Sequence, residues 1–410
     1  MSIYTDAQEI IHSALEACLP DQAVRRALEG KEFGSGRIFL VALGKAAWQM
    51  AHCAAELLGP RLERGVVVTK HGHSQGDIPR CQVFEGGHPV PDEGSFQGTR
   101  AAMELVQDLE PQDTVVLLVS GGGSALFESP LIPAEELAQL TSALLACGAD
   151  IVEMNTLRKR LSAVKGGRFA QLCAPAQVYS IVLSDILGDP LDMIASGPAY
   201  PDRSTCAQAR AIAEKYQLPL SDQARALLDQ ETPKELDNVE TIITGSVREL
   251  CSAAAAVCQQ LGYETHILTD QLCCQAREAG SFLASIARTH GQDGRSLAFL
   301  AGGETVVLLT GKGLGGRNQE LALSAAEGIS GMDNALIFSL GSDGTDGPTD
   351  AAGGIVDGQT QGKLVQAGLT IHQVLADNDA YHALEKVDGL IRTGPTGTNV
   401  NDVAVVLLKN

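Results

Sequence analysis

The chain has 410 residues, of which 44% are hydrophobic, and 50 acidic against 30 basic side chains give it a formal net charge of −20. Two domains are expected, because one hydrophobic core rarely serves a chain of this length. The acidic balance excludes a general binding surface for nucleic acids or anionic membranes.

Helix and strand patterns alternate along the first half of the chain. The first helix is predicted near the N-terminus, with Thr5 and Gln8 as a capping box and Gly30 as its end. Strands are predicted where apolar and β-branched residues run together, at 37–43, 65–69, 114–120 and 178–184. The helix patterns fall at 46–58, 94–109, 134–147 and 152–172.

Residues 217–240 are polar and include Pro233, so we predict a domain boundary there, between domains 1–235 and 236–410. The second half has a helix pattern at 247–261 and strand patterns at 241–244, 265–268, 297–301, 306–310, 335–340 and 403–408. Continuous apolar strands alternating with helices predict an α/β fold with parallel or mixed sheets. Ligands of such folds bind beyond the carboxyl ends of the strands.

The ten cysteines show no C-x-x-C pair and no regular spacing. Scattered thiols in a chain of this length indicate buried apolar residues in a reducing compartment. The first ten residues carry no apolar run typical of a signal peptide, and no apolar stretch reaches the ~18 residues of a membrane span. We therefore expect a cytoplasmic protein without a membrane partner.

A glycine cluster follows predicted strand 114–120, with the residues Gly121, Gly122, Gly123 and Ser124. Free backbone N–H groups in such a loop are typical of a phosphate site, although a tight turn would use the same residues. The G-x-x-x-x-G-K-[ST] pattern of an ordinary P-loop is absent. Lys45 follows predicted strand 37–43 and is either a phosphate ligand or a solvated lysine at a turn.

A basic segment stands out in this acidic chain. Residues 153–168 hold five basic side chains and one acidic one. On the predicted helix 152–172, one face carries four of the polar side chains at i, i+3, i+7 and i+10, namely Asn155, Arg158, Ser162 and Lys165. This face is either an anion site or a solvated helix surface.

Acidic residues cluster in two other loops. Asp185 and Asp189 follow predicted strand 178–184, where they suit a metal ligand and a base, or simply cap a turn. Asp343, Asp346 and Asp350 lie in a loop rich in Gly, Thr and Pro, which favours metal or phosphate contact or ordinary turn chemistry. Asp185, Asp189, Asp346 and Asp350 therefore all remain candidate metal ligands.

The pattern G-x-G-x-x-G occurs at residues 311–316, after predicted strand 306–310. A dinucleotide site would need an acidic residue about 20 positions later, at the end of the next strand. The nearest such residue, Asp343, lies farther along the chain. Arg317, at a helix start, instead suits bidentate binding of an anion.

Ten short motifs follow one another along nearly the whole chain: V-A-L-G-K-A-A (41–47), G-H-P-V-P-D-E-G-S (87–95), S-G-G-G-S-A-L (120–126), L-S-A-V-K-G-G-R (161–168), S-D-I-L-G-D-P (184–190), I-A-S-G-P (194–198), G-G-E-T (302–305), G-K-G-L-G-G-R-N-Q-E (311–320), G-T-D-G-P-T-D-A-A-G (344–353) and T-G-P-T-G-T-N (393–399). In this order they resemble the class II glycerate kinases, the glycerate 2-kinase family whose C-terminal part is called the MOFRL domain. Departures are small: Arg160 replaces a common histidine, Phe169 a leucine and Val306 a threonine.

The resemblance implies phosphorylation of D-glycerate at its C2 hydroxyl, with ATP and Mg²⁺, to give 2-phosphoglycerate and ADP. It also implies two three-layer α/β/α domains, a Rossmann-like N-terminal domain and a smaller C-terminal MOFRL domain, with the active site in the cleft between them. The implied catalytic residues are Lys45, Asp185 and Arg317. The nucleotide is expected at Gly121, Gly122, Gly123, Ser124, Asn155, Arg158, Lys165, Gly313 and Gly315, and the metal at Asp189 and Asp346.

Two other functions fit parts of the sequence. An NAD(P)-dependent hydroxypyruvate reductase would account for the G-x-G-x-x-G pattern. Two observations count against it: Asp343 lies too far along the chain to bind the ribose of a dinucleotide, and Asp185 and Asp189 form an acidic pair that a reductase does not need. A non-catalytic module that binds phosphorylated metabolites would need the glycine loops and the basic segment but not Asp185. We expect a monomer or a small homo-oligomer.

Overall fold

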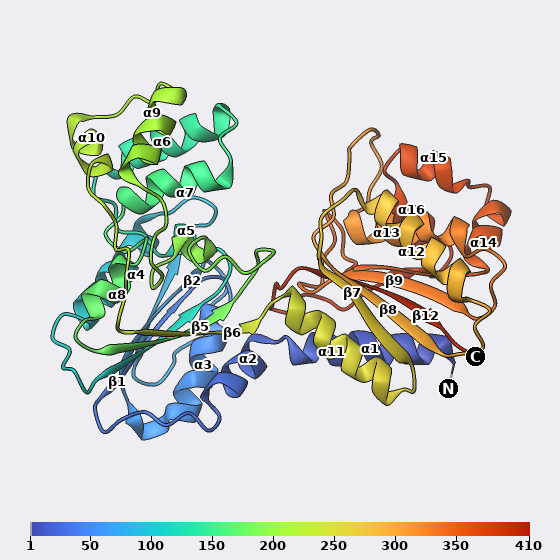
Figure 1. Cartoon of the computed structure of the whole chain (residues 1–410), viewed down its shortest axis with the longest axis horizontal. Coiled ribbons are helices and arrows are strands. Elements are labelled where there is room, and N and C mark those ends of the chain that lie inside the picture. The colour runs from blue at the N-terminus through green and yellow to red at the C-terminus, as the bar shows by residue number, and fades with distance from the viewer. Residues whose placement is uncertain (1) are drawn as a thin grey trace. The chain divides into compact units, whose positions relative to one another are not determined.

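The structure, a computed structural model, describes residues 2–410 and divides into two compact units (Figure 1). The first unit comprises Val24–Leu183 and Asp189–Thr244. The second comprises the segment that ends at Ala23, Ser184–Gly188 and Gly245–Asn410. The prediction of an active site in a cleft between two domains stays a prediction.

This division differs from the predicted domains 1–235 and 236–410 in three places. The N-terminal helix and Ser184–Gly188 belong to the second unit, and residues 236–244, predicted to begin the second domain, belong to the first. Helix α1 (Ile3–Ala17) packs on α11 (Val247–Gln260) of the second unit, with Ala7, Ile10 and Ala14 in the shared core. A sequence pattern reveals the apolar face of a helix but not the surface that covers this face. The sequence therefore could not show that the first helix packs against the second unit.

The first unit contains a six-stranded sheet in the order β3-β2-β1-β4-β5-β6, and the pairs from β3 through β5 are parallel. This order is that of the Rossmann fold. The strands are β1 (Ile38–Leu43), β2 (Leu62–Lys70), β3 (Cys81–Gly86), β4 (Thr114–Val119), β5 (Gln177–Leu183) and β6 (Val239–Gly245). Strands β1 and β4 are buried along their whole length, as expected for parallel strands with both faces covered.

Helices cover both faces of this sheet. Helix α3 (Ala47–Leu58) connects β1 to β2, and α4 (Glu93–Leu105) connects β3 to β4 in the opposite direction along the sheet. Because such crossovers are right-handed, α3 and α4 lie on opposite faces. The remaining helices of this part are α2 (Pro20–Leu28), α5 (Gly123–Leu126) and α8 (Arg168–Cys173), with the 3-10 turns η1 (Gly59–Arg61) and η2 (Ile194–Ser196).

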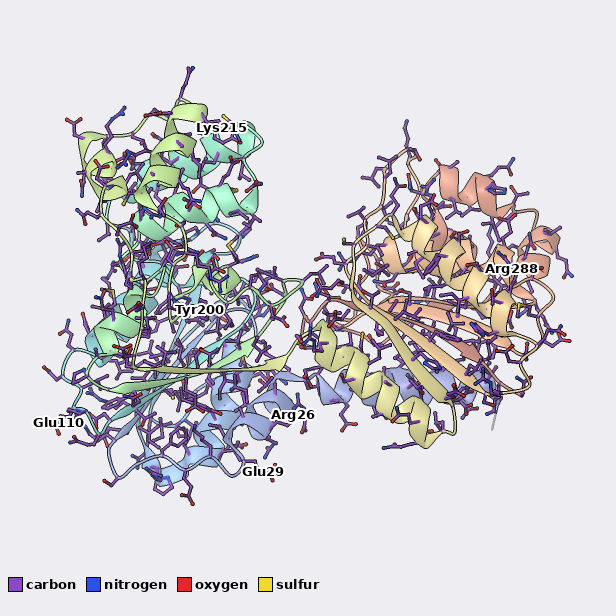
Figure 2. All side chains as sticks on the ribbon, in the orientation of Figure 1. Arg26, Glu29, Glu110, Tyr200, Lys215 and Arg288 are labelled. Carbon is purple, nitrogen blue, oxygen red and sulfur yellow. The ribbon has the colours of Figure 1, made fainter. Side chains whose placement is uncertain are left out.

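Four further helices form a separate layer with its own small core, which includes Leu140, Leu157 and Leu228. They are α6 (Ala134–Ala146), α7 (Ile151–Arg160), α9 (Cys206–Lys215) and α10 (Asp222–Leu228). Figure 1 shows them gathered away from the sheet of the first unit, and Figure 2 labels Lys215 at the end of α9.

The second unit contains a mixed sheet in the order β11-β10-β9-β12-β8-β7, in which only β7 and β8 pair in parallel. Side chains of β8 alternate between two cores: Phe299 faces the core that includes α12 and α13, and Leu300 faces the core of α1 and α11. The strands are β7 (Glu264–Leu272), β8 (Leu297–Gly303), β9 (Ala335–Gly341), β10 (Gly353–Asp357), β11 (Leu390–Ile391) and β12 (Asp402–Leu408).

Two groups of helices cover the two faces of this sheet, which gives three layers (Figure 1). One face carries α1 and α11. The other carries α12 (Ala276–His290), α13 (Arg317–Gly328), α14 (Thr360–Gln366), α15 (Ile371–Ala376) and α16 (Ala380–Glu385). The predicted fold class, two three-layer α/β units, is confirmed. None of the ten cysteines forms a disulfide, and no helix among residues 2–410 is long and apolar enough to cross a membrane.

Three predicted elements are wrong. The N-terminal helix is capped by Ser2 rather than Thr5, and it ends before Pro20, which starts a second helix. The helix predicted at 152–172 ends at Arg160, and a second helix begins only at Arg168, directly after Gly166 and Gly167, whose φ angles are 58° and 84°.

The strand predicted at 306–310 is absent, and residue 306 makes only an isolated bridge to Gln275. Its apolar residues Val306, Leu308 and Leu309 are 55%, 58% and 79% exposed. An apolar run alone does not determine whether a neighbouring strand is available to pair with it.

Candidate active site

The loops after β1 and β4 meet at the carboxyl edge of the first sheet. The two strands are neighbours, and the chain leaves them toward helices on opposite sides, which is where open α/β sheets bind ligands. The N–H of Lys45 donates to the carbonyl oxygen of Gly121, at 2.8 Å. Gly44 has a φ of 113°, and a Cβ there would lie 2.3 Å from Oγ of Ser120. The structure thus brings the predicted lysine and the predicted phosphate loop together.

The side chain of Lys45 is half-buried, and its ammonium group has no hydrogen-bond or ion-pair partner among residues 2–410. A Cβ on Gly122 would lie 3.2 Å from Cγ of Lys45, so the lysine stem borders the glycine loop. Gly122 has a φ of 83°, which favours glycine. The helix that follows, α5, has only four residues, so its dipole adds little to an anion site.

A hydrogen-bonded chain supports the glycine loop from behind. Oγ of Ser124 lies 3.0 Å from Oγ of Ser196, which donates to Oδ1 of Asn155 at 3.0 Å. Ala195 and Ser196 have positive φ angles of 51° and 59°, and a Cβ on Gly123 would lie 2.6 Å from Cβ of Ala195. Asn155 is 2% exposed, so the structure corrects its predicted nucleotide contact to a supporting role.

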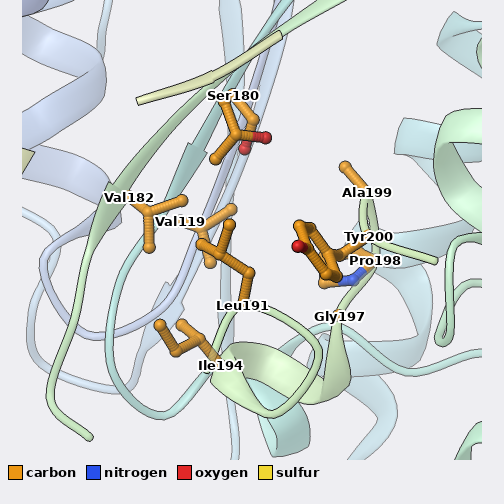
Figure 3. A pocket seen from close by; sticks show the side chains of 10 residues that line it. Val119, Ser180, Val182, Leu191, Ile194, Gly197, Pro198, Ala199 and Tyr200 are labelled. Atoms are coloured by element: carbon orange, nitrogen blue, oxygen red, sulfur yellow. The ribbon is translucent and has the colours of Figure 1, made fainter. Parts of the chain in front are cut away.

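The segment 191–200 also covers a cavity of about 20 Å³ against β4 and β5 (Figure 3). Val119 and Val182 line it from the sheet, and Leu191, Ile194 and Tyr200 line it from the covering segment. A space of this size holds about one water molecule. The cavity is therefore a packing gap behind the loop and not a substrate site.

Most basic side chains of the segment 153–168 are buried and form ion pairs with acidic residues of the protein. Lys165 is 0% exposed and donates to Glu128 and to the carbonyl oxygen of Phe127, so the structure corrects its predicted contact with a nucleotide. Burial lowers the pKa of Lys165, and Glu128 opposes this effect. Lys159 and Arg160 are also buried and pair with Asp202 and other acids.

Arg158 differs from these buried basic residues. It is half-buried, and its guanidinium group has no hydrogen-bond or ion-pair partner among residues 2–410. Burial lowers its pKa, against the attraction of Glu128. Three side chains of this segment, Asn155, Arg158 and Lys165, are predicted to contact the nucleotide. Among them, only Arg158 keeps N–H donors that are available to an anion.

In the second unit, Arg317 at the start of α13 is held by two carboxylates. Its Nε and Nη2 donate to both oxygens of Asp402, at 2.6 and 3.0 Å, and Nη1 donates to Glu304 at 2.7 Å. Burial would lower the pKa of Arg317, but the two carboxylates outweigh burial and raise it. The side chain remains 32% exposed, so the guanidinium is oriented and still reachable.

Asp185 is joined to this network through Asn401. Nδ2 of Asn401 donates to the carbonyl oxygen of Asp185 and to Oε2 of Glu304, at 3.2 Å each. Because both partners only accept, the orientation of the amide is determined, and its Oδ1 is left buried without a partner. The structure thus brings Asp185 and Arg317 to one network.

The sequence reasoning did not identify Glu304, Asn401 or Asp402 as site residues. A signal was present for each. Glu304 lies in the motif G-G-E-T, Asn401 directly precedes the last strand and Asp402 begins it, after a glycine-rich loop. What the sequence lacked was the antiparallel pairing of β12 with β8, which places Asp402 opposite Gly303.

Asp346, a predicted metal ligand, caps helix α13 instead. Its two oxygens accept from the N–H groups of Asn318 and Gln319, at 3.1 and 2.8 Å, and the residue is 3% exposed. Burial raises the pKa of Asp346 to about 7, although the two N–H donors favour its charged form. The structure corrects the metal assignment, because the helix N-terminus already uses both oxygens.

Replacing Asp346 with alanine is expected to lower the free energy of unfolding by about 1–2 kcal/mol, the usual loss for a helix cap. Chemical denaturation followed by circular dichroism measures it. Asp350→Ala is the matched control, since Asp350 is exposed and contacts only Tyr381 and Arg392. Equal loss in both variants would contradict the assignment of Asp346 as the cap.

The loop with the G-x-G-x-x-G pattern is bound to the protein rather than open to a phosphate. The N–H of Gly313 donates to the carbonyl oxygen of Asp377 at 2.7 Å, and that of Leu314 donates to Asp379 at 2.9 Å. A Cβ on Gly313 would lie 2.4 Å from Cβ of Asp379, so close packing explains this glycine. The structure corrects the nucleotide contact predicted for Gly313, while that of Gly315 stays a prediction.

Among residues 2–410 no three His, Cys, Asp or Glu side chains are grouped closely enough to hold a metal by themselves. Asp189, at a φ of 51°, has one buried carboxylate oxygen, Oδ1, that accepts no hydrogen bond. A single free carboxylate fits Mg²⁺, which commonly takes one or two protein carboxylates and completes its shell with phosphate and water.

Comparisons with known families match most of the chain. Residues 6–229 match a family described as "Domain of unknown function (DUF4147)", and residues 297–402 match the MOFRL family.

Full-length relatives are also found. A D-glycerate 2-kinase of Thermotoga maritima is 51% identical over 98% of this chain and 97% of its own length. A glycerate 2-kinase of Pyrococcus horikoshii is 40% identical over 100% and 98%. A putative hydroxypyruvate reductase of Agrobacterium vitis is 39% identical over 91% and 87%. The crystal structure of a Thermotoga maritima glycerate kinase matches with a TM-score of 0.95 and 51% identity, covering 99% of both chains.

Proposed function

We propose that this chain, which belongs to the glycerate kinase family with a C-terminal MOFRL domain, is a D-glycerate 2-kinase. The reaction is transfer of the γ-phosphoryl group of ATP to the C2 hydroxyl of D-glycerate, which gives 2-phosphoglycerate and ADP. A cytoplasmic location and a monomeric or small oligomeric state remain predictions.

The observation that carries this proposal is the unpaired Lys45 beside the Gly121–Ser124 loop, at the switch point of the first sheet. Phosphoryl transfer requires mainly positioning and neutralisation of charge on the phosphoryl oxygens. An ammonium group without a protein counter-ion, beside a glycine loop, supplies both in a chain of net charge −20.

The other proposed roles follow from the network in the second unit. Asp185 orients or deprotonates the C2 hydroxyl, with its backbone held by Asn401. Arg317 binds the glycerate carboxylate or the transferring phosphoryl group, in an orientation that Asp402 and Glu304 determine. Arg158 is a further donor for the nucleotide phosphates.

Asp189 is the residue that we propose to hold Mg²⁺, because its buried Oδ1 lacks a partner. When bound, the ion neutralises charge on the nucleotide phosphates. Asp346 is not part of this proposal.

A coupled assay tests the function. The protein is supplied with ATP, Mg²⁺ and D-glycerate and coupled to enolase and pyruvate kinase, with phosphoglycerate mutase left out. Signal without mutase establishes 2-phosphorylation. Signal that needs mutase means that the C3 hydroxyl is phosphorylated, and the proposed position is then wrong.

The similarity to putative hydroxypyruvate reductases makes reduction the second candidate. Against it, β1 runs into Gly44 and Lys45 without the three-glycine fingerprint of a dinucleotide site, and the 311–316 pattern does not follow a strand. Oxidation of NAD(P)H with hydroxypyruvate, together with no phosphorylation of D-glycerate, would replace the kinase proposal.

A further inference from the structure

Basic side chains follow three adjacent parallel strands of the first sheet, next to the glycine loop after the fourth. In the sheet order β3-β2-β1-β4, His88 follows β3, Lys70 and His73 lie at or beyond the end of β2, and Lys45 follows β1. The carboxyl ends of parallel strands share one edge, so these groups form a row that leads to Gly122.

Contacts confirm that the row is continuous. A Cβ on Gly122 would lie 3.0 Å from Cδ2 and 3.2 Å from Nε2 of His88, and 3.2 Å from Cγ of Lys45. Nδ1 of His73 lies 3.0 Å from the backbone oxygen of Lys45. His88 is half-buried, and neither of its ring nitrogens has a partner among residues 2–410.

Two carboxylates lie near this row, and other groups donate to each of them. Glu85 accepts from the N–H groups of Gly72 and Ser74, at 3.0 and 2.9 Å. Asp92 accepts from His71 at 2.6 Å and from the N–H of Gly87 at 2.9 Å. Neither carboxylate forms an ion pair with Lys45, Lys70 or His88 among residues 2–410, so these three side chains remain available to an anion.

We propose that His88 binds a phosphate dianion beside Lys45 and Gly122, and that protonation of its imidazole strengthens this binding. The proposal deepens the kinase function by adding a residue to its phosphate site. Burial and the positive charges of Lys45, Lys70 and His73 hold the pKa of His88 below its ordinary value, so these surroundings disfavour the imidazolium when no ligand is bound. A dianion would offset these charges and favour the imidazolium.

The test uses sulfate, which stays a dianion between pH 5.5 and 8.0, so any pH dependence belongs to the protein. Calorimetry measures the Kd of sodium sulfate at both pH values and at constant ionic strength. Binding that raises the pKa of His88 by about one unit is expected to lower the wild-type Kd at pH 5.5 about fivefold relative to pH 8.0, because the full tenfold effect requires a pH well below the free pKa. His88→Gln should show less than about twofold change.

His71→Gln is the matched control, because His71 lies in the same loop region but its ring contacts Asp92. It should behave as the wild type does. A pH dependence that survives in His88→Gln, or none in the wild type, overturns the proposal. If His88→Gln does not fold, NMR of the wild-type His88 resonance decides, and an unchanged pKa with saturating sulfate overturns it.

Competition identifies the phosphate. Displacement of sulfate by ADP assigns the site to the nucleotide, displacement by 2-phosphoglycerate assigns it to the product, and displacement by neither overturns the proposal. Because sulfate binding needs no turnover, an inactive protein that still binds sulfate in this way would contradict the kinase function alone.

Discussion

Lys45→Ala is expected to lower kcat for phosphorylation of D-glycerate about 10³-fold, equivalent to about 4 kcal/mol of transition-state stabilisation. The ammonium group lies beside Gly122 without a protein counter-ion among residues 2–410, so its full charge is available to the transferring phosphoryl group. Steady-state kinetics with the coupled assay measures the change, and the assignment predicts that kcat falls more than KM rises.

The same variant should fold as the wild type does. Because the Lys45 ammonium has no partner among residues 2–410, its removal is expected to change the free energy of unfolding by less than about 0.5 kcal/mol. Lys215→Ala is the matched control for activity, since Lys215 pairs with Glu153 in the helical layer. An active Lys45→Ala would remove Lys45 from the proposed site, and an inactive Lys215→Ala would show that the assay reports general damage.

Asp202→Ala is expected to lower the free energy of unfolding by about 3 kcal/mol, because Lys159 and Arg160 lose their most buried carboxylate partner and keep only the more exposed Asp192 and Glu231. Asp202 is 1% exposed and accepts from Lys159, Ser204 and Thr232, at 2.7–3.1 Å. Arg160, which is 0% exposed, lies 3.6 Å from its second oxygen. Denaturant unfolding measures the loss.

Asp229→Ala is the matched control, because Asp229 is an exposed aspartate of the same unit that pairs only with Arg210. It should cost no more than about 1 kcal/mol. Comparable losses in the two variants would show that the buried network contributes little.

The Asp202 network also has an expected pH dependence. Burial would raise the pKa of Asp202, but Lys159, Thr232 and Ser204 outweigh it and hold the pKa below the ordinary value. The contribution of Asp202 to stability is therefore present above about pH 4, the pKa of an unfolded aspartate, and is lost as pH falls through the lower folded value. Asp202→Ala should lose less stability than the wild type across that acid range.

The α/β class, most of the buried strands and the family could be predicted from the amino-acid sequence alone. Strands such as β4, which is buried throughout, carry a local signal because parallel strands covered on both faces are continuously apolar. Lys45 and the Gly121–Ser124 loop were predictable for a similar reason: both directly follow such strands, and parallel topology places strand ends at one edge.

Which polar side chains remain available to a ligand became clear only from the folded structure. Lys45, Arg158 and Lys165 are alike in sequence, yet Lys165 is paired with Glu128 in the interior and the other two are not. Asp346 and Asp189 both looked like metal ligands, but Asp346 caps a helix that begins 29 residues earlier, at Arg317. Whether a charged side chain is available to a ligand depends on partners distant in the chain, because burial forces each charge to find a counter-charge or a donor.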